Sequence, residues 1–414
     1  MNAWARTLVG LGACAAGGAV IVAQTLTLDG HPSIQYNVRP ATDRVAKLNE
    51  ALARSARTLQ RDARTGYLLS VLDALGVSVE SQQLVFSKTG IQRAYTSPHN
   101  PRALFFNESV AVGYIPGAPE LEVASHDPQQ GVVFYTLDQA AAVTPVFTRR
   151  DSCLSCHQSE STFNVPGMIA RSHMVDGEGQ VLPQLGSATV NHRTPHTERW
   201  GGWFVTANAE APRYNPLGHL GNATVTVHPT SGPKIISNHV FIEWMASAPE
   251  TRGYPSSASD IGSLLVFDHQ MHAINLLTRL NWESRTGATN VGARVNELAD
   301  YLLFVGEATP VVTVTPRPGF AASLRSRMPR DRQGRSLGEL DLADRLMKYP
   351  CSFMVYAEAF EALPAPVKDA VYRRMFEILS GKDTSRRYGH LSPSDRRAIL
   401  EILQDTKQGL PPIT

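Results

Sequence analysis

The spacing of apolar residues predicts two short helices near the N-terminus. Thr42 and Asp43, whose side chains suit helix caps, precede the first apolar series. One face of this helix would carry Val45, Leu48, Leu52 and Leu59. The second helix would bury Leu68, Val71, Leu72 and Leu75, and Gly76 follows as its stop. We therefore expect two amphipathic helices that each cover an apolar surface.

The pattern changes between residues 84 and 137, where short apolar runs alternate with turns. The runs cover residues 84–86, 103–106, 110–115, 120–124 and 132–137. They are separated by turn sequences, namely Ser97-Pro98, Pro116-Gly117 and Asp127-Pro128. This arrangement predicts short antiparallel strands, and we expect the last two runs to form a hairpin.

The second half of the chain changes from loops to helices. Residues 158–255 are rich in Gly, Pro and Asn, and we expect loops there, with strand-like pieces at 204–206 and 224–227 and an extended or helical piece at 235–244. A capping sequence at Ser257 and Asp260 then begins a long helix that stops at Gly287. Further helices are expected at 295–305, 337–349, 353–363, 366–379 and 392–407.

These elements predict an α+β fold in one compact unit. N-terminal helices, short antiparallel strands and a loop-rich segment would form a mixed α/β region over 40–255, with a mainly helical region over 256–414 packed on it. A length of 414 residues with 43% apolar residues supplies a core of ordinary size. The 39 basic and 37 acidic residues leave a formal net charge of +2, which gives nucleic-acid binding no electrostatic support.

Residues 1–24 have the features of an export signal. Arg6 is the only early charge, and the uncharged run from Leu8 to Ala23 is shorter than the about 20 residues that a spanning helix needs. An uncleaved N-terminal anchor is the alternative, and Leu11-Gly12-Ala13-Cys14 also resembles a bacterial lipobox. We therefore expect the protein in the periplasm or on the periplasmic face of the inner membrane, with membrane contact only through such an anchor.

The cysteine count becomes informative once Cys14 is assigned to this segment. Cys153, Cys156 and Cys351 remain, an odd and small number for a disulfide scaffold. Residues 151–157 read Asp-Ser-Cys-Leu-Ser-Cys-His, a C-x-x-C-H motif. This is the pattern of covalent c-type haem attachment, in which two thiols hold the haem and the adjacent imidazole ligates the iron. Cys351 is expected to be a buried small hydrophobe.

Two other uses of a cysteine pair have less support. A zinc site needs two more ligands, and the chain has no second pair. A dithiol redox pair would precede a helix in a βαβ unit, whereas Asn164-Val165-Pro166-Gly167 ends any such helix early. We therefore predict one covalent haem c, bound by Cys153 and Cys156, with His157 as the proximal iron ligand.

The sixth coordination position of the iron would decide the function. A second protein ligand there favours electron transfer, whereas an open position favours binding and reaction of a substrate at the iron. His269 and His272 fall on one apolar stripe of the long helix, and His269 is the preferred distal ligand. The alternatives are His272, His219 and Met168, with Met174 close behind. For the two helix residues the structural alternative is a core histidine bonded to backbone or carboxylate.

A segment at 191–203 combines His, Arg, Glu and Trp and holds the candidate catalytic residues. His192 and Arg193 would form a polar distal set with His269 if the protein is an enzyme. The arginines of this segment could also clamp the haem propionates. The alternative is a polar turn whose Trp side chains fill the core.

The motif Cys153–His157 resembles the haem-binding signature of the c-type cytochrome superfamily. Four further sequence segments resemble segments of large exported bacterial monohaem cytochrome c-like proteins. They are LVFSK at 84–88, PRALFF at 101–106, ERWGGW at 198–203 and YPCS at 349–352. Because these segments span most of the chain, the whole chain resembles one family unit. It departs from small cytochromes in its length and in lacking a Met at the usual distance from the motif.

Two functions follow from this resemblance and from the motif. The first is a periplasmic c-type haem protein that carries out electron transfer with a redox partner protein. The second is a haem-dependent oxidoreductase, peroxidase- or oxygenase-like, with an open or displaceable sixth iron site and a small-molecule substrate. The length of the chain favours the second, since a shuttle needs fewer residues, while the lack of a second C-x-x-C-H motif weakens a dihaem peroxidase.

Overall fold

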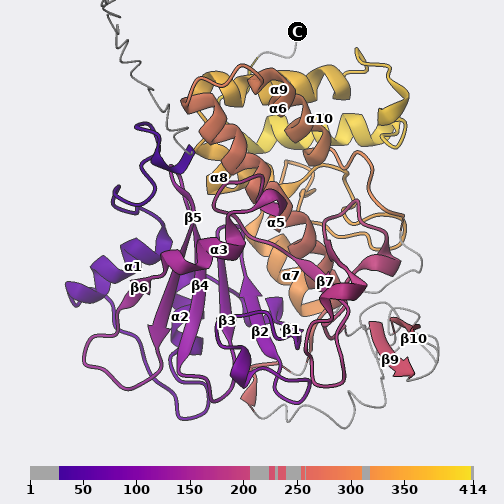
Figure 1. Ribbon diagram of the computed structural model, residues 1–414. Coiled ribbons are helices and arrows are strands. Elements are labelled where there is room, and N and C mark those ends of the chain that lie inside the picture. The colour runs from indigo at the N-terminus through magenta and orange to yellow at the C-terminus, as the bar shows by residue number, and fades with distance from the viewer. Residues whose placement is uncertain are drawn as a thin grey trace, which may run out of the picture.

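A six-stranded antiparallel sheet lies between two N-terminal helices and a long helix that leads into a helical C-terminal half (Figure 1). The computed structural model describes residues 28–205, 223–228, 232–238, 253–256, 258–309 and 318–411. The predicted α+β class is confirmed. The segment 1–24 lies outside the described residues.

The strands follow one another across the sheet in chain order. They are β1 (Gln83–Val85), β2 (Arg102–Phe106), β3 (Val110–Tyr114), β4 (Glu120–Asp127), β5 (Gly131–Asp138) and β6 (Phe147–Arg149). Five of them match the predicted runs, and β4 and β5 form the predicted hairpin. The short edge strand β6 is not among the predicted elements and carries the chain from the hairpin into the C-x-x-C-H motif.

One face of the sheet is covered by α1 (Arg44–Ala53) and α2 (Leu68–Leu75). The side chain of Asp43 accepts hydrogen bonds from the first backbone N–H groups of α1, as the cap prediction requires. Gly76 ends α2 with a φ of 66°, a left-handed conformation that glycine adopts without strain. Leu59 is buried but lies beyond α1, so the predicted first helix is too long.

The other face of the sheet packs on α5 (Ile261–Arg285), which is buried along most of its length. Its N-cap is Asp260, which accepts a hydrogen bond from the backbone N–H of Ser263. The helix therefore begins directly after Asp260, the second residue of the predicted capping sequence, and the predicted long helix is confirmed. One hydrophobic core joins α5 to sheet residues such as Phe106 and Phe134, so the two predicted regions pack together.

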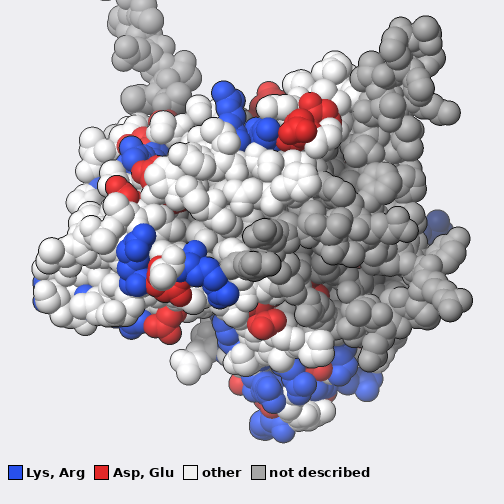
Figure 2. Space-filling view, turned by 90° about the horizontal axis from the view of Figure 1, so that it is seen from below, with Lys and Arg blue, Asp and Glu red and all other residues white. Residues whose placement is uncertain are grey.

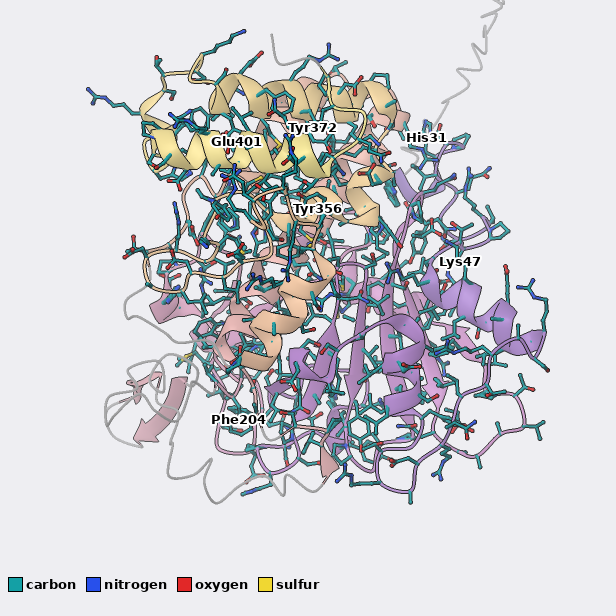
Figure 3. The ribbon with its side chains drawn as sticks, turned by 180° about the vertical axis from the view of Figure 1, so that it is seen from behind. His31, Lys47, Phe204, Tyr356, Tyr372 and Glu401 are labelled. Atoms are coloured by element: carbon teal, nitrogen blue, oxygen red, sulfur yellow. The ribbon has the colours of Figure 1, made fainter. Side chains whose placement is uncertain are left out.

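The remaining helices gather around α5. They are α6 (Val291–Leu302), α7 (Pro318–Arg327), α8 (Glu358–Glu361), α9 (Ala365–Leu379) and α10 (Pro393–Thr406). Figure 1 shows α6, α9 and α10 stacked at one end of the molecule, and Figure 3 shows Tyr372 and Glu401 in this stack, away from Lys47 on α1. None of the helices in the described ranges combines the length and apolarity of a membrane span.

The predicted helix at 337–349 is wrong, because this segment consists of turns. The carboxylate of Asp341 accepts hydrogen bonds from the backbone N–H groups of Ala343 and Asp344, a local bond that competes with a helix. Leu340 and Met347 instead form an isolated antiparallel bridge. The helix predicted at 353–363 is also divided, into a 3-10 turn (Phe353–Tyr356) and α8.

Two small sheets lie within the loop-rich region. They are β7 (Arg171–His173) with β8 (Ser187–Thr189), and β9 (Ala223–His228) with β10 (Gly232–Asn238). The strand prediction at 224–227 is thus correct, whereas the described part of 204–206 is not a strand. On the described part of the face in Figure 2, basic side chains lie beside acidic ones, in keeping with the small net charge.

Candidate functional site

The C-x-x-C-H motif forms a short helical turn at the surface of the sheet. A 3-10 turn (Asp151–Cys153) leads directly into α3 (Leu154–His157), which Figure 1 shows in front of β4. The helical spacing places the two thiols and the imidazole close together. Both cysteines are free thiols, with Cys156 exposed and Cys153 half-buried. The predicted attachment residues thus lie on one accessible turn.

A backbone carbonyl fixes the imidazole of His157. Its Nδ1 lies 3.0 Å from the carbonyl oxygen of Gly167. Because a carbonyl oxygen only accepts, Nδ1 carries the ring proton and Nε2 carries the lone pair. Burial lowers the pKa of His157 to about 4, so the ring is neutral at pH 7. A metal-binding histidine is commonly held in this way, with one nitrogen on a fixed acceptor and the other left for the metal.

The loop after the motif is held in place by α5. The side chain of Asn275 accepts a hydrogen bond from the backbone N–H of Met168 (2.9 Å) and donates one to its carbonyl oxygen (2.7 Å). A Cβ at Gly167 would lie 2.2 Å from the Asn275 Oδ1 atom, so the close approach requires glycine. The orientation of the motif imidazole therefore depends on α5, through Asn275 and Gly167.

Small side chains line the sheet face beside the motif. Gly113 lies between Leu104 and Glu122 in the register of β2, β3 and β4. In the next row, Ala111 is opposite Ala124, which in turn is opposite a phenylalanine on β5. We call this patch of the sheet the small-residue trough, which consists of Leu104, Ala111, Gly113, Ala124 and Phe134; Leu104 and Ala124 are half-buried and the other three are buried.

The trough lies next to the imidazole of the motif. The rings of His157 and Phe134 are in contact, with centroids 4.7 Å apart. The three atoms nearest to a Cβ at Gly113 belong to Leu104 and Glu122, both on the sheet itself. The sheet beside the imidazole thus carries small and apolar side chains. The side chain of Arg171 makes a long hydrogen bond of 3.4 Å to Ser161, and its charge, like that of Arg102, lowers the pKa of His157.

The alternatives for the cysteine pair gain nothing from this geometry. Burial, with the nearby Glu122 carboxylate, raises the pKa of Cys153 to about 11, whereas a dithiol redox pair needs a lowered thiol pKa. Within the described ranges no group of three or more His, Cys, Asp or Glu side chains could hold a metal ion. A zinc site at these cysteines therefore has no further ligands there.

Two of the predicted distal ligands, His269 and His272, belong to α5. Met168 directly follows Gly167, whose carbonyl oxygen lies 3.0 Å from Nδ1 of His157. The backbone of Met168 is bonded to Asn275 of α5. The role of these three residues as distal ligands stays a prediction, and His219 lies outside the described residues.

His269 is instead part of a buried cluster with His192. Their Nδ1 atoms lie 2.7 Å apart, and Nε2 of His269 lies 2.6 Å from the hydroxyl oxygen of Ser352. Tyr301 stacks on His192 with ring centroids 4.1 Å apart, and the guanidinium of Arg193 lies 5.0 Å from the Tyr301 centroid. The predicted set of His192, Arg193 and His269 is thus brought together, but in the core between α5 and α6.

His272 connects this cluster to the loop of the motif. Its ring contacts both Phe163, in that loop, and Tyr301, with centroids 5.3 Å and 4.8 Å apart. Burial lowers the pKa of His272 to about 4, so it is a neutral imidazole. An unbroken series of aromatic contacts therefore runs from the motif loop to the buried cluster.

The tryptophans of the 191–203 segment fill the core. The indole N–H of Trp200 donates to Asp268 (2.8 Å) and that of Trp203 donates to the carbonyl oxygen of Arg171 (2.8 Å). Arg199 donates to the carbonyl oxygens of Thr194 and His192, away from the motif. The geometry therefore supports the structural alternative for this segment rather than a propionate clamp.

Several important residues were not predicted. Asn275, Ser352 and Tyr301 act through partners distant in the chain, and nothing in the local sequence identifies them. The trough was foreseeable, because residues 111, 113 and 124 are small and fall on one face of two predicted strands.

Comparison of the chain with family models, with curated proteins and with solved structures finds no match. The cytochrome resemblance of the motif thus gains no support from relatives. A functional proposal must therefore rest on the geometry of the site.

Proposed function

We propose that this protein is a monohaem c-type protein of the periplasm that carries out electron transfer. Cys153 and Cys156 would bind the haem covalently, and His157 would ligate the iron through Nε2. The observation that carries the proposal is the hydrogen bond from His157 Nδ1 to the carbonyl oxygen of Gly167, since it leaves the Nε2 lone pair free for a metal.

The surroundings of the motif fit this cofactor. The small and apolar side chains of the trough lie beside the imidazole, and the exposed Cys156 keeps the motif within reach of a partner protein. Arg171 is a candidate partner for a propionate, because it makes no ion pair among the described residues. When bound, the haem supplies a one-electron redox centre, and the chain holds and orients it.

A second candidate function is a haem-dependent oxidoreductase. The observation that favours it is that both ring nitrogens of His269, the preferred distal ligand, are engaged by His192 and Ser352 in the core. If His269 keeps these bonds, the sixth position would be open or weakly filled, and a small substrate could enter it.

Covalent haem staining after denaturing electrophoresis tests the shared part of both functions. The full-length protein, produced in a host that exports and assembles c-type cytochromes, should retain haem on the gel. C153S and C156S should each weaken the stain, and the double variant should abolish it. C351S is the matched control, because this buried free thiol lies outside the motif. A wild-type protein without covalent haem would contradict the proposal.

The visible spectrum of the reduced protein with and without carbon monoxide separates the two functions. Electron transfer with a second protein ligand predicts no change on adding carbon monoxide. An open position predicts a shifted absorption band, and the oxidoreductase would then replace the electron carrier as the better assignment.

A further inference from the structure

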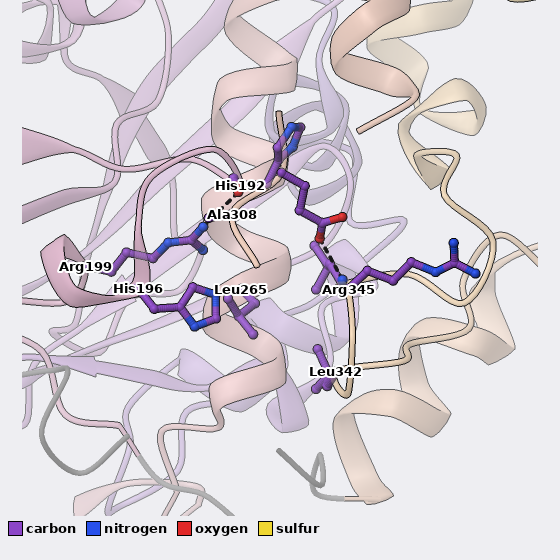
Figure 4. Close-up of a pocket in the computed structure, with 9 residues that line it drawn as sticks. His192, His196, Arg199, Leu265, Ala308, Leu342 and Arg345 are labelled. Carbon is purple, nitrogen blue, oxygen red and sulfur yellow. Dashed lines mark hydrogen bonds between the residues drawn. The ribbon is translucent and has the colours of Figure 1, made fainter. Parts of the chain in front are cut away.

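A buried polar cavity lies apart from the motif, between the 192–199 segment, the first turns of α5 and residues 307–308 and 342–346. Its polar walls include the side chains of His196, Arg199, Glu307 and Arg345, and Figure 4 shows His196 and Arg199 on one side and Arg345 on the other. We call it the His196 cavity. It adjoins a surface groove of about 710 Å³, with which it shares Glu307 and Arg345.

His196 has an unused nitrogen in this cavity. The side chain is only 4% exposed, and Nδ1 has no hydrogen-bond partner among the described residues. An unpartnered buried polar group costs about 1–3 kcal/mol, so a buried imidazole of this kind needs a partner. Burial lowers the pKa of His196 to about 4, so the ring is neutral and one of its nitrogens is an N–H donor.

Arg199 is a buried cation that has more N–H groups than hydrogen-bond acceptors. Its side chain is 2% exposed, and among the described residues it donates hydrogen bonds from Nε to the carbonyl oxygen of Thr194 and from Nη2 to that of His192. A guanidinium carries five N–H groups, so three remain. The nearest carboxylate, Asp268, lies 3.6 Å from Nη1, beyond hydrogen-bond distance, and also accepts from Trp200.

Arg199 has two carboxylates nearby, and neither accepts a hydrogen bond from it among the described residues. Burial lowers the pKa of Arg199, and the charges of Asp268 and Glu307 oppose this effect. A buried charge is stable only when its counter-charge and hydrogen bonds are complete. Two guanidinium groups, Arg199 and Arg345, face one carboxylate, Glu307, in the cavity wall, so the cavity does not favour a cation.

From this geometry we infer that the His196 cavity binds the carboxylate group of a small organic acid, with Arg199 and His196 as its hydrogen-bond donors. A carboxylate offers two acceptor oxygens in one plane, which match the planar guanidinium. The cavity itself offers about 10 Å³, the space of about one water molecule, so it would take one carboxylate oxygen and the rest of the acid would extend into the adjoining groove past Glu307 and Arg345. This inference does not depend on the haem.

Glu307 is the acidic group that faces the bound anion. Its Oε1 accepts a hydrogen bond from the backbone N–H of Leu346 (2.7 Å), and burial raises its pKa to about 7. The ionised side chain would repel a carboxylate. Replacing Glu307 with glutamine keeps an oxygen that accepts from the N–H of Leu346 and removes the negative charge. We therefore expect this variant to bind a carboxylate more tightly than the wild type.

Isothermal titration of the full-length protein with sodium formate at pH 8 tests the inference. We expect one formate per chain, with binding about tenfold weaker in H196A because one donor is lost. E307Q should bind about tenfold more tightly, since a like charge is removed. H173A is the matched control, because His173 is also buried, also has an unpartnered Nδ1, and does not line the cavity.

Two outcomes would overturn the inference. One is the absence of formate binding in both the wild type and E307Q, which would mean that the cavity holds water only. The other is equal weakening by H196A and H173A, which would place the binding elsewhere. Haem staining of the same samples keeps the two proposals separate, because formate binding without haem would contradict only the proposed function.

Discussion

At the residue scale, Ser352 connects the buried histidine pair to the backbone. Its hydroxyl oxygen accepts a hydrogen bond from the backbone N–H of Met354 (3.1 Å) and lies 2.6 Å from Nε2 of His269. Nδ1 of His269 in turn lies 2.7 Å from Nδ1 of His192. Because only one of these two Nδ1 atoms can carry the proton between them, the tautomers of the two imidazoles are coupled.

Replacing this hydroxyl should destabilise the fold. S352A leaves Nε2 of His269 and the N–H of Met354 without a partner in a fully buried site, so we expect the free energy of unfolding to fall by about 1–3 kcal/mol. Urea unfolding followed by circular dichroism measures this. S326A, at an exposed serine of α7, should change it by less than about 0.5 kcal/mol. Equal effects of the two substitutions would show that the network contributes nothing.

Individual site residues were predictable only where the partner is close in sequence. Cys153, Cys156 and His157 are identified by their spacing alone. The hydrogen bond between His269 and Ser352 spans 83 residues, and that between Asn275 and Met168 spans 107. Such pairs depend on how helices and loops pack, and the sequence around each residue carries no signal of it.

At the element scale, β3 carries a glycine, Gly113, at the position where a side chain would face the C-x-x-C-H motif. Gly113 places no side chain on the sheet face between Leu104 and Glu122, beside the motif. The strand itself is buried and paired on both edges, so its backbone does not need glycine for its conformation. The absence of a side chain here is therefore better explained by the space that it leaves.

Filling the trough should reduce haem attachment. G113L places a branched side chain on the surface proposed for the macrocycle, and we expect less covalent haem per chain, measured as the ratio of haem to protein absorbance. G292L is the control, because a Cβ at Gly292 on α6 meets nothing within 4 Å. Circular dichroism of both variants checks that they fold. Unchanged haem content in a folded G113L protein would rule out the trough as the haem surface.

Most elements could be predicted because their ends are marked locally. Asp43, Gly76 and Ser392 cap helices by bonds to neighbouring residues or by a left-handed turn, and all three are recognisable in the sequence. The 337–349 segment has apolar residues at helical spacing, yet its buried Leu342 adopts a φ of 62° between turns. Tertiary packing decided that conformation, so no local pattern could reveal it.

At the scale of the whole molecule, buried neutral histidines should make the protein sensitive to acid. Burial lowers the pKa of six histidines outside the motif, namely His126, His173, His192, His196, His269 and His272. In the unfolded chain the histidine pKa is about 6.5, so between about pH 4 and 6.5 the unfolded state binds more protons than the folded state. Folding stability should therefore fall as the pH drops through this range.

Buried carboxyl groups act in the opposite sense but are fewer. Burial raises the pKa of Asp43, and it raises those of Asp268 and Glu307 to about 7. We expect the urea midpoint of unfolding to decrease from pH 7.5 to pH 5, by fluorescence or circular dichroism. A midpoint that stays constant or rises on acidification would show that the histidines are not held neutral.

The order of the strands also has a consequence for the sequence of folding events. Each of the six strands pairs with its neighbour in the chain, so the sheet needs only local contacts and can form early. The motif loop is held by the hydrogen bonds between Met168 and Asn275, which lie 107 residues apart. These bonds can form only after the second half of the chain has packed against the sheet. Maturation would thus proceed in two stages, in which the thiols are presented on a finished sheet before the imidazole is locked in its final orientation.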